Sequence, residues 1–207
     1  MIRRRLRAAA SAALLMTVAA CGGGSNAATR LEGAVAEPPL FVGDQQLPEG
    51  ENGEPFTFRA PEGELLAVYF GYTQCPDLCP TTMADIKAAL ALLPDGADRV
   101  SVAMVTVDPE RDNAKILTAY LGHFFGEASH PLRTTDSEQL KSVEKAFLAT
   151  SNVQKTRDEV IVEHTATTSI VDDSGTVVVQ WPFGTTAESM AHDFEILLDR
   201  EPASAKT

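Results

Sequence analysis

The chain has 207 residues, of which 44% are hydrophobic and 22% are charged. This length allows one well-buried domain and is too short for two large ones. The formal net charge of −12 argues against a nucleic-acid partner, because such a partner requires basic patches. An acidic chain of this kind is expected to be soluble.

Residues 1–20 have the pattern of a secretory signal. Four arginines in MIRRRLR precede a short apolar stretch, and small residues lead to Cys21. The apolar part is too short for a helix that spans a membrane. Removal of this segment, which holds four arginines and no acids, would change the net charge from −12 to −16.

The sequence VAAC at residues 18–21 resembles the lipobox of bacterial lipoproteins, in which the cysteine becomes lipidated. A lipid on Cys21 would hold the domain at a membrane and would account for the unpaired third cysteine of an exported chain. Ordinary cleavage that leaves or removes a free Cys21 is the alternative. Residues 21–38 are interpreted as a flexible tether, and we expect anchoring on the outer face of the bacterial cell membrane.

Residues 39–200 are predicted to form one domain, followed by a loose tail at 201–207. The segment 40–60 places PEGENGEP between LFV and FTF, which predicts an N-terminal β-hairpin at the edge of the domain. The apolar runs at 64–72 and 99–110 predict two central strands.

Apolar spacing and capping residues predict helices at 80–94, 113–126, 136–150 and 186–200. A short strand is expected at 131–135. A hairpin is expected at 164–184, with its turn at DDSG and with Trp181-Pro182 ending it at the surface. This order predicts an α/β fold in which helices flank a mixed sheet.

Cys75 and Cys79 lie where a central strand ends and a helix begins. The helix dipole and free N–H groups favour thiolates there, and Cys79, beside Pro80, is the closer to the predicted helix start. Such a pair either forms and exchanges a disulfide or binds a soft metal such as Cu(I). Three intervening residues, where thioredoxin has two, leave room for both sulfurs to face one ion. A simple structural disulfide is the third possibility.

A copper ion held by two sulfurs needs a further ligand, and imidazole is the natural one. Among the four histidines, His123 and His192 are expected to face water from helices, and His130 is expected in a loop. His164 comes just before the last predicted hairpin, which in a thioredoxin-like sheet lies across from the cysteines. It is interpreted either as a metal ligand or as a buried structural histidine.

Four segments together resemble the SCO/SenC family of copper proteins: VYFGYTQCPDLCPTTMADI, VTVDPERDN, EHTATTSIVDDSG and WPFGTTAESMAHD. The resemblance covers about residues 40–199. It implies a thioredoxin-like fold that binds copper, as Cu(I) or Cu(II), through Cys75, Cys79 and His164. Asp77 and Glu163 are candidates for tuning the charge around these ligands.

The resemblance further implies a metallochaperone, rather than an enzyme, that assists assembly of the binuclear copper centre of cytochrome c oxidase. Its partner would be the oxidase subunit that carries this centre, or another copper protein. The alternative is an extracytoplasmic thiol–disulfide oxidoreductase with Cys75 and Cys79 as its redox-active disulfide. The chain departs from the family pattern at Glu163-His164-Thr165, where Asp-His-Ser is frequent, and at Gln74, where histidine is frequent.

Overall fold

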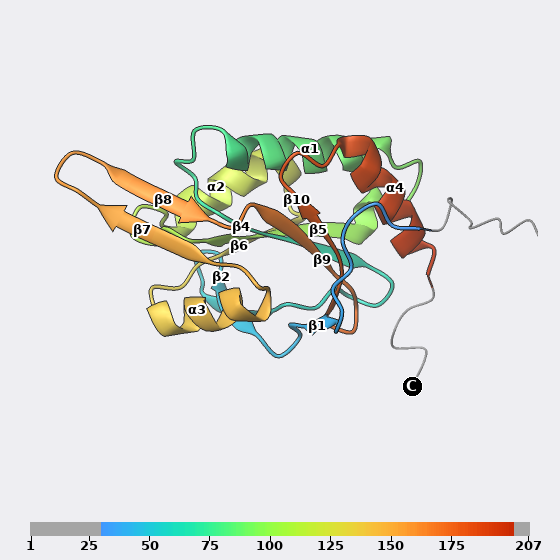
Figure 1. Cartoon of the computed structure of the whole chain (residues 1–207), viewed down its shortest axis with the longest axis horizontal. Coiled ribbons are helices and arrows are strands. Elements are labelled where there is room, and N and C mark those ends of the chain that lie inside the picture. The colour runs from blue at the N-terminus through green and yellow to red at the C-terminus, as the bar shows by residue number, and fades with distance from the viewer. Residues whose placement is uncertain (1–29, 201–207) are drawn as a thin grey trace, which may run out of the picture.

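The computed structural model describes residues 30–200 (Figure 1). The predicted signal peptide, the proposed lipidation site Cys21, residues 21–29 of the tether and the tail 201–207 lie outside the described residues. Within the described part of the chain, no helix is long and apolar enough to cross a membrane.

An eight-stranded mixed sheet runs through the molecule, in the order β1-β10-β9-β4-β5-β6-β2-β3. The central strands β4, β5 and β6 are parallel, and β9 is antiparallel to β4. The bounds of the eight strands are β1 Leu40–Phe41, β2 Gln46–Glu49, β3 Glu54–Thr57, β4 Leu65–Gly71, β5 Val100–Thr106, β6 Ser129–Leu132, β9 Thr167–Val171 and β10 Thr176–Pro182.

Four α-helices flank this sheet: α1 Leu78–Leu92, α2 Ala114–Phe125, α3 Ser137–Ala146 and α4 Ala187–Leu198. A short 3-10 helix, Ala97–Arg99, precedes β5. Asn113, Asp136 and Thr186 cap α2, α3 and α4 through side-chain oxygens that accept backbone N–H groups. The four predicted helices are confirmed, but α1 begins two residues earlier than its sequence pattern indicates, at Leu78.

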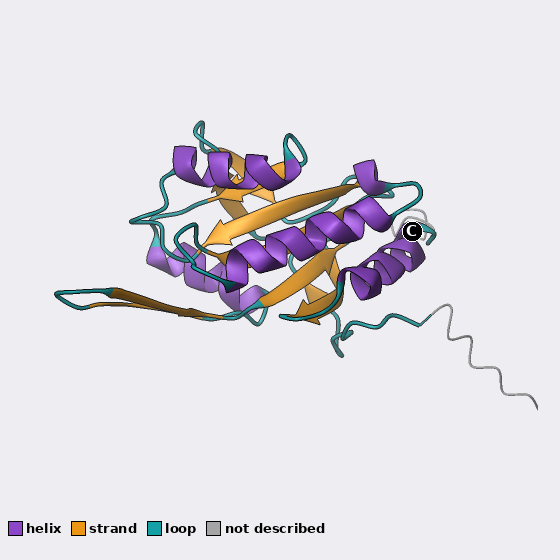
Figure 2. Cartoon of the chain, turned by 90° about the horizontal axis from the view of Figure 1, so that it is seen from above, coloured by secondary structure: helices purple, strands orange, loops and turns teal. Residues whose placement is uncertain are grey.

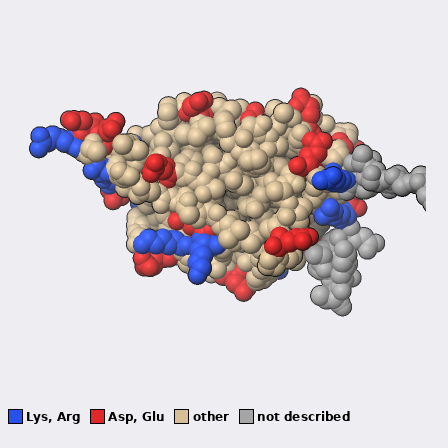
Figure 3. Space-filling model, in the orientation of Figure 1, with Lys and Arg blue, Asp and Glu red and all other residues tan. Residues whose placement is uncertain are grey.

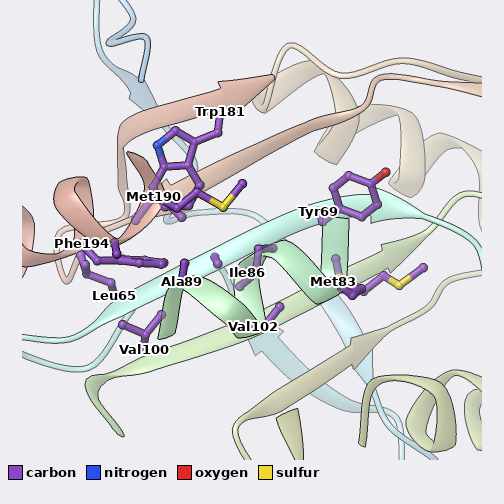
Figure 4. Packing of buried hydrophobic residues seen from close by; sticks show 14 of the residues in the cluster. Leu65, Tyr69, Met83, Ile86, Ala89, Val100, Val102, Trp181, Met190 and Phe194 are labelled. Atoms are coloured by element: carbon purple, nitrogen blue, oxygen red, sulfur yellow. The ribbon is translucent and has the colours of Figure 1, made fainter. Parts of the chain in front are cut away.

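The core has two layers because side chains of β4 alternate between the two faces of the sheet. Leu65 and Tyr69 pack with α1, α2 and α4, whereas Leu66 and Phe70 pack with α3. Figure 4 shows the first layer, where Met83 and other residues of α1 lie over β4. Burial on both faces explains why β4 reads as a continuous apolar run.

The predicted N-terminal hairpin forms, with its second strand overlapping the expected FTF segment but with its first strand at other residues. Its strands are β2 and β3, which add to the sheet beside β6. Leu40–Phe41, expected to be the first hairpin strand, instead pairs with β10 at the opposite edge as β1. The turn-rich segment therefore supplies strands to both edges of the sheet.

A buried carboxylate fixes the start of the described chain. Asp193 in α4 is fully buried and accepts the backbone N–H groups of Glu32 (2.7 Å) and Gly33 (2.9 Å) and the indole N–H of Trp181 (2.9 Å). Residues 32–33, which the sequence placed in the flexible tether, are thus bound to the domain. The expectation of a surface position for Trp181 was wrong, because this carboxylate satisfies its indole inside the core.

A second hairpin, which the sequence did not predict, is formed by β7 Ser151–Lys155 and β8 Val160–His164. It is a separate two-stranded sheet, and it projects from the body of the protein in two perpendicular views (Figures 1 and 2). Charged residues gather on its outer part (Figure 3), and its turn contains Arg157, Asp158 and Glu159. We call residues 151–164 the histidine hairpin, since its last residue is His164.

Candidate metal centre

The fold brings together three residues that are far apart in sequence. Cys75, Cys79 and His164 each offer a ligand atom, and these atoms all lie within 4.8 Å of one another. Cys79 Sγ is 3.8 Å from His164 Nε2. Within residues 30–200, this is the one cluster of three or more histidine, cysteine or acidic residues with the spacing of a metal site. Two sulfurs and one imidazole nitrogen suit a soft metal ion.

The two cysteines occupy different environments at the start of α1. Cys75 precedes the helix and is 8% exposed, and its sulfur accepts the backbone N–H of Cys79 at 3.3 Å. Cys79 lies in the first helical turn and is completely buried, and burial raises the pKa of its thiol to about 12. Because the helix begins at Leu78, Cys79 is the closer to the helix start, as predicted, but the free N–H group there is donated to Cys75. Burial favours the neutral thiol of Cys79 and not the thiolate that was expected.

Gly71, the last residue of β4, allows the close approach of strand and cysteine. A Cβ atom at this position would lie 3.1 Å from Cys79 Sγ and 2.7 Å from the ring of Tyr69. Real Cβ atoms are almost never found as close as the second distance. The glycine in the sequence FGYTQC therefore makes space for the Tyr69 ring and for the buried sulfur beside it.

His164 reaches the cysteines from the end of β8. Its Nδ1 lies 3.1 Å from the carbonyl oxygen of Thr165, which requires a proton on Nδ1 and directs the Nε2 lone pair toward the sulfurs. Burial lowers the pKa of this imidazole, and the neutral form is the one that binds metals. The position of the ring is thus set by the backbone of the residue that follows it.

Two tyrosines that the sequence analysis did not identify surround the same cluster. The rings of Tyr69 and Tyr72 meet the His164 ring edge-on, at centroid distances of 6.0 Å and 5.9 Å. The hydroxyl of Tyr69 donates to Cys79 Sγ at 3.8 Å. Burial raises the pKa of Tyr69 far above its ordinary value, so this hydroxyl stays protonated. Their place at the end of β4, just before the cysteines, was the only sequence signal.

The segment VDPERD braces residues 72–77, the loop that carries Cys75 and leads to Cys79, which we call the cysteine loop. Asp112 is fully buried, and its carboxylate accepts the N–H of Thr73 (2.9 Å), the hydroxyl of Thr73 (2.5 Å) and the hydroxyl of Thr106 (2.7 Å). Arg133 donates to the carbonyl oxygen of Asp112 at 2.8 Å. One carboxylate thereby ties the cysteine loop to the end of β5.

A second connection from the same segment explains the residue at position 74. Arg111 is paired with the buried Asp108 and donates to Gln74 Oε1 at 3.3 Å. Its guanidinium also lies 5.6 Å from the centroid of the Tyr72 ring, at cation–π distance. Gln74, where the family often has histidine, is thus an acceptor for Arg111.

The two candidates for tuning the ligands contact other groups. Asp77 is the N-cap residue of α1 and is exposed, and its carboxylate lies 3.5 Å from the hydroxyl of Thr81. Glu163 accepts from the side-chain amide of Asn152 at 3.2 Å. It is exposed because neighbouring residues of a strand face opposite sides, so Glu163 points away when His164 points inward.

The other three histidines lie apart from the cluster. His123 is exposed on α2, as predicted. His130 belongs to β6 rather than to a loop, and its Nδ1 lies 2.7 Å from Glu49. His192 is half-buried on α4 beside Asp193, at 3.3 Å, rather than fully in water.

Known proteins resemble this chain over most of the residues that the structure describes. The family model SCO1/SenC matches residues 36–199. The SCO2-like protein of Rickettsia prowazekii is 31% identical over 131 residues, which cover 60% of this chain and 62% of that protein. This chain therefore spans somewhat less than two thirds of the length of that relative.

Solved structures show the same architecture. The apo Sco1 protein of Thermus thermophilus has a TM-score of 0.66 and 30% identity, over 83% of this chain and 97% of that one. The copper-bound ScoI of Bradyrhizobium japonicum has a TM-score of 0.61 and 29% identity, over 79% and 97%. The predicted thioredoxin-like α/β fold is thereby confirmed. With the family model matching most of its length, this chain belongs to the SCO1/SenC family.

Proposed function

We propose that the protein binds one copper ion through Cys75, Cys79 and His164 and delivers it to another protein. The observation that carries this proposal is the convergence of two sulfurs and one nitrogen within 4.8 Å. This donor set suits Cu(I), which prefers thiolate and imidazole ligands. The copper-bound state of the similar ScoI from Bradyrhizobium japonicum supports the choice of metal.

The receiving protein is proposed to be the cytochrome c oxidase subunit that carries the binuclear copper centre, as membership in this family implies. Lipidation of Cys21 would keep the domain beside a membrane-bound partner. A related structure from Bacillus anthracis is described as a SCO1/SenC family lipoprotein, with 22% identity and a TM-score of 0.62.

Copper titration of the reduced full chain tests the site. The wild type is expected to bind about one Cu(I) per chain in competition with a chromophoric chelator. The His164→Ala variant should bind it at least about 100-fold more weakly, since loss of even an outer partner of a metal ligand costs about 10–100-fold. His123→Ala is the matched control, because His123 is exposed on α2. Equal affinity of the two variants would contradict the three-ligand site.

A second candidate function, reduction of a disulfide in an acceptor protein, is favoured by the different exposure of the two cysteines. Cys75 is the more exposed of the two cysteines and its sulfur accepts the helix N–H, whereas Cys79 is completely buried. The Cys75 thiolate would attack the substrate disulfide and form a mixed disulfide, and the departing sulfur would take up a proton. Cys79 would then attack Cys75 and release the second thiol, with two electrons passed to the substrate.

The histidine separates the two functions. Thiol exchange needs both cysteines but does not need His164, whereas the three-ligand copper site needs all three residues. A His164→Ala variant that loses copper and still reduces a model disulfide would show that the chain has both capacities. A variant that loses both would show that disulfide reduction also depends on the histidine.

A further inference from the structure

A hydrogen-bond donor that is not one of the proposed ligands lies beside Cys75, Cys79 and His164, the three residues that we call the metal cluster. Tyr69 is fully buried in β4, and its hydroxyl lies 3.8 Å from Cys79 Sγ. The hydroxyl of Thr82 lies beside the same phenol and donates its own proton to the carbonyl oxygen of Leu78 at 2.9 Å. The phenol hydroxyl donates its proton to Cys79 Sγ.

Tyr69 also contacts the other side of the cluster. Its ring stands at 89° to the His164 ring, with the centroids 6.0 Å apart. One side chain thus contacts the buried sulfur through its hydroxyl and the imidazole through its ring. The contact with the sulfur joins β4 to α1, so it does not depend on the position of the histidine hairpin, whereas the ring contact does.

We infer that Tyr69 is a positioning residue that sets the reduction potential of the bound copper. This inference rests on the proposed copper binding at Cys75, Cys79 and His164. Hydrogen bonds to a cysteine sulfur tune the potential of a copper–thiolate site. The sulfur gives less of its charge to Cu(I) than to Cu(II), so a donor stabilises the Cu(I) form more. The phenol hydroxyl therefore raises the potential and favours the cuprous form.

The test is the Tyr69→Phe variant, which removes one hydroxyl and keeps the ring against His164. Affinities for Cu(I) and Cu(II) are measured on the full chain by chelator competition, and the potential by redox titration. We expect the ratio of Cu(I) to Cu(II) affinity to fall about tenfold, which corresponds to a potential lower by about 59 mV for a one-electron couple. The sulfur-to-Cu(II) charge-transfer band should also shift, because the sulfur becomes a better donor.

Tyr120→Phe is the matched control. The hydroxyl of Tyr120 in α2 is buried, and among the described residues it has no hydrogen-bond partner. Its removal should leave the affinity ratio and the charge-transfer band unchanged. Thermal unfolding of the copper-free chains shows whether either variant is damaged in its fold.

The outcomes separate the inference from the proposed function. If the wild type fails to bind copper, the proposed site is wrong. If the wild type binds copper and Tyr69→Phe keeps both the affinity ratio and the charge-transfer band of the wild type, the role of Tyr69 is wrong while the site stands. An equal shift in the Tyr120→Phe control would also overturn it, because the effect would then not require contact with the sulfur.

Discussion

The two halves of the metal cluster are held in contrasting ways. The cysteine loop lies against the central sheet, with Cys79 fully buried and Asp112 accepting three hydrogen bonds beneath it. The histidine hairpin is a separate pair of strands that projects from the domain (Figure 2). A metal ion bound between them would join a rigid element to a weakly supported one. The contrast predicts that the cysteine half governs stability and that the histidine half responds to the metal.

The largest expected effect comes from the brace of the cysteine loop. Asp112→Asn replaces one acceptor oxygen by a donor that faces the N–H and hydroxyl groups of Thr73 and Thr106. We expect the free energy of unfolding to fall by about 2–3 kcal/mol, the contribution typical of a hydrogen-bonded buried charge. Denaturant unfolding of the copper-free chain measures it.

Asp95→Asn is the control for this change, because Asp95 is exposed and its substitution should alter stability by less than about 0.5 kcal/mol. Similar losses in both variants would show that the brace is not a centre of stability.

Hydrogen exchange provides the next test. Without copper, amides of β7 and β8 should exchange much faster than those of β4 and β5, since a two-stranded sheet opens locally. Free Cu(I) at a hundredfold excess over its dissociation constant should slow the exchange of the hairpin amides by up to about 100-fold, because opening must release His164. The distinction between the halves would be lost if copper did not slow the exchange of the hairpin amides. It would also be lost if copper slowed their exchange equally in the His164→Ala variant.

A further effect is confined to alkaline pH and to the cysteine half. Burial raises the pKa of Cys79 from 9.0 to about 12, so the folded state favours its neutral thiol. This contribution to stability is fully present below about pH 9 and is lost as the pH rises toward about 12. Tyr69 acts in the same direction. Unfolding measured from pH 7 to 11 should show the decline in the wild type and a smaller decline in Cys79→Ala.

The central sheet could be predicted because its strands and helices have strong local patterns. The continuous apolar run of β4 and the helical spacing of Met83 and Ile86 each indicate the correct element without knowledge of the rest. The histidine hairpin escaped prediction because its turn lacks glycine and because β7 contains a single apolar residue, Val153. Charged turns of this kind do not differ from surface loops in sequence.

Local sequence patterns likewise indicated only part of the metal cluster. The cysteines lie four residues apart, so their proximity follows from the sequence, whereas His164 joins them only through the topology of the fold. The tyrosines were missed because a tyrosine in an apolar strand reads as core packing. Trp181 was misplaced because its partner, Asp193, lies in another helix.

The attachment of Glu32 and Gly33 to Asp193 determines how the domain responds to a pull on its N-terminal side. The first described residues lie beside α4, at the end of the molecule opposite the histidine hairpin (Figure 1). Tension along the chain would therefore pass into α4 and β10 and would leave the metal cluster unloaded. The proposed lipid anchor on the N-terminal side would thus leave the end that carries Cys75, Cys79 and His164 free to meet the proposed partner protein.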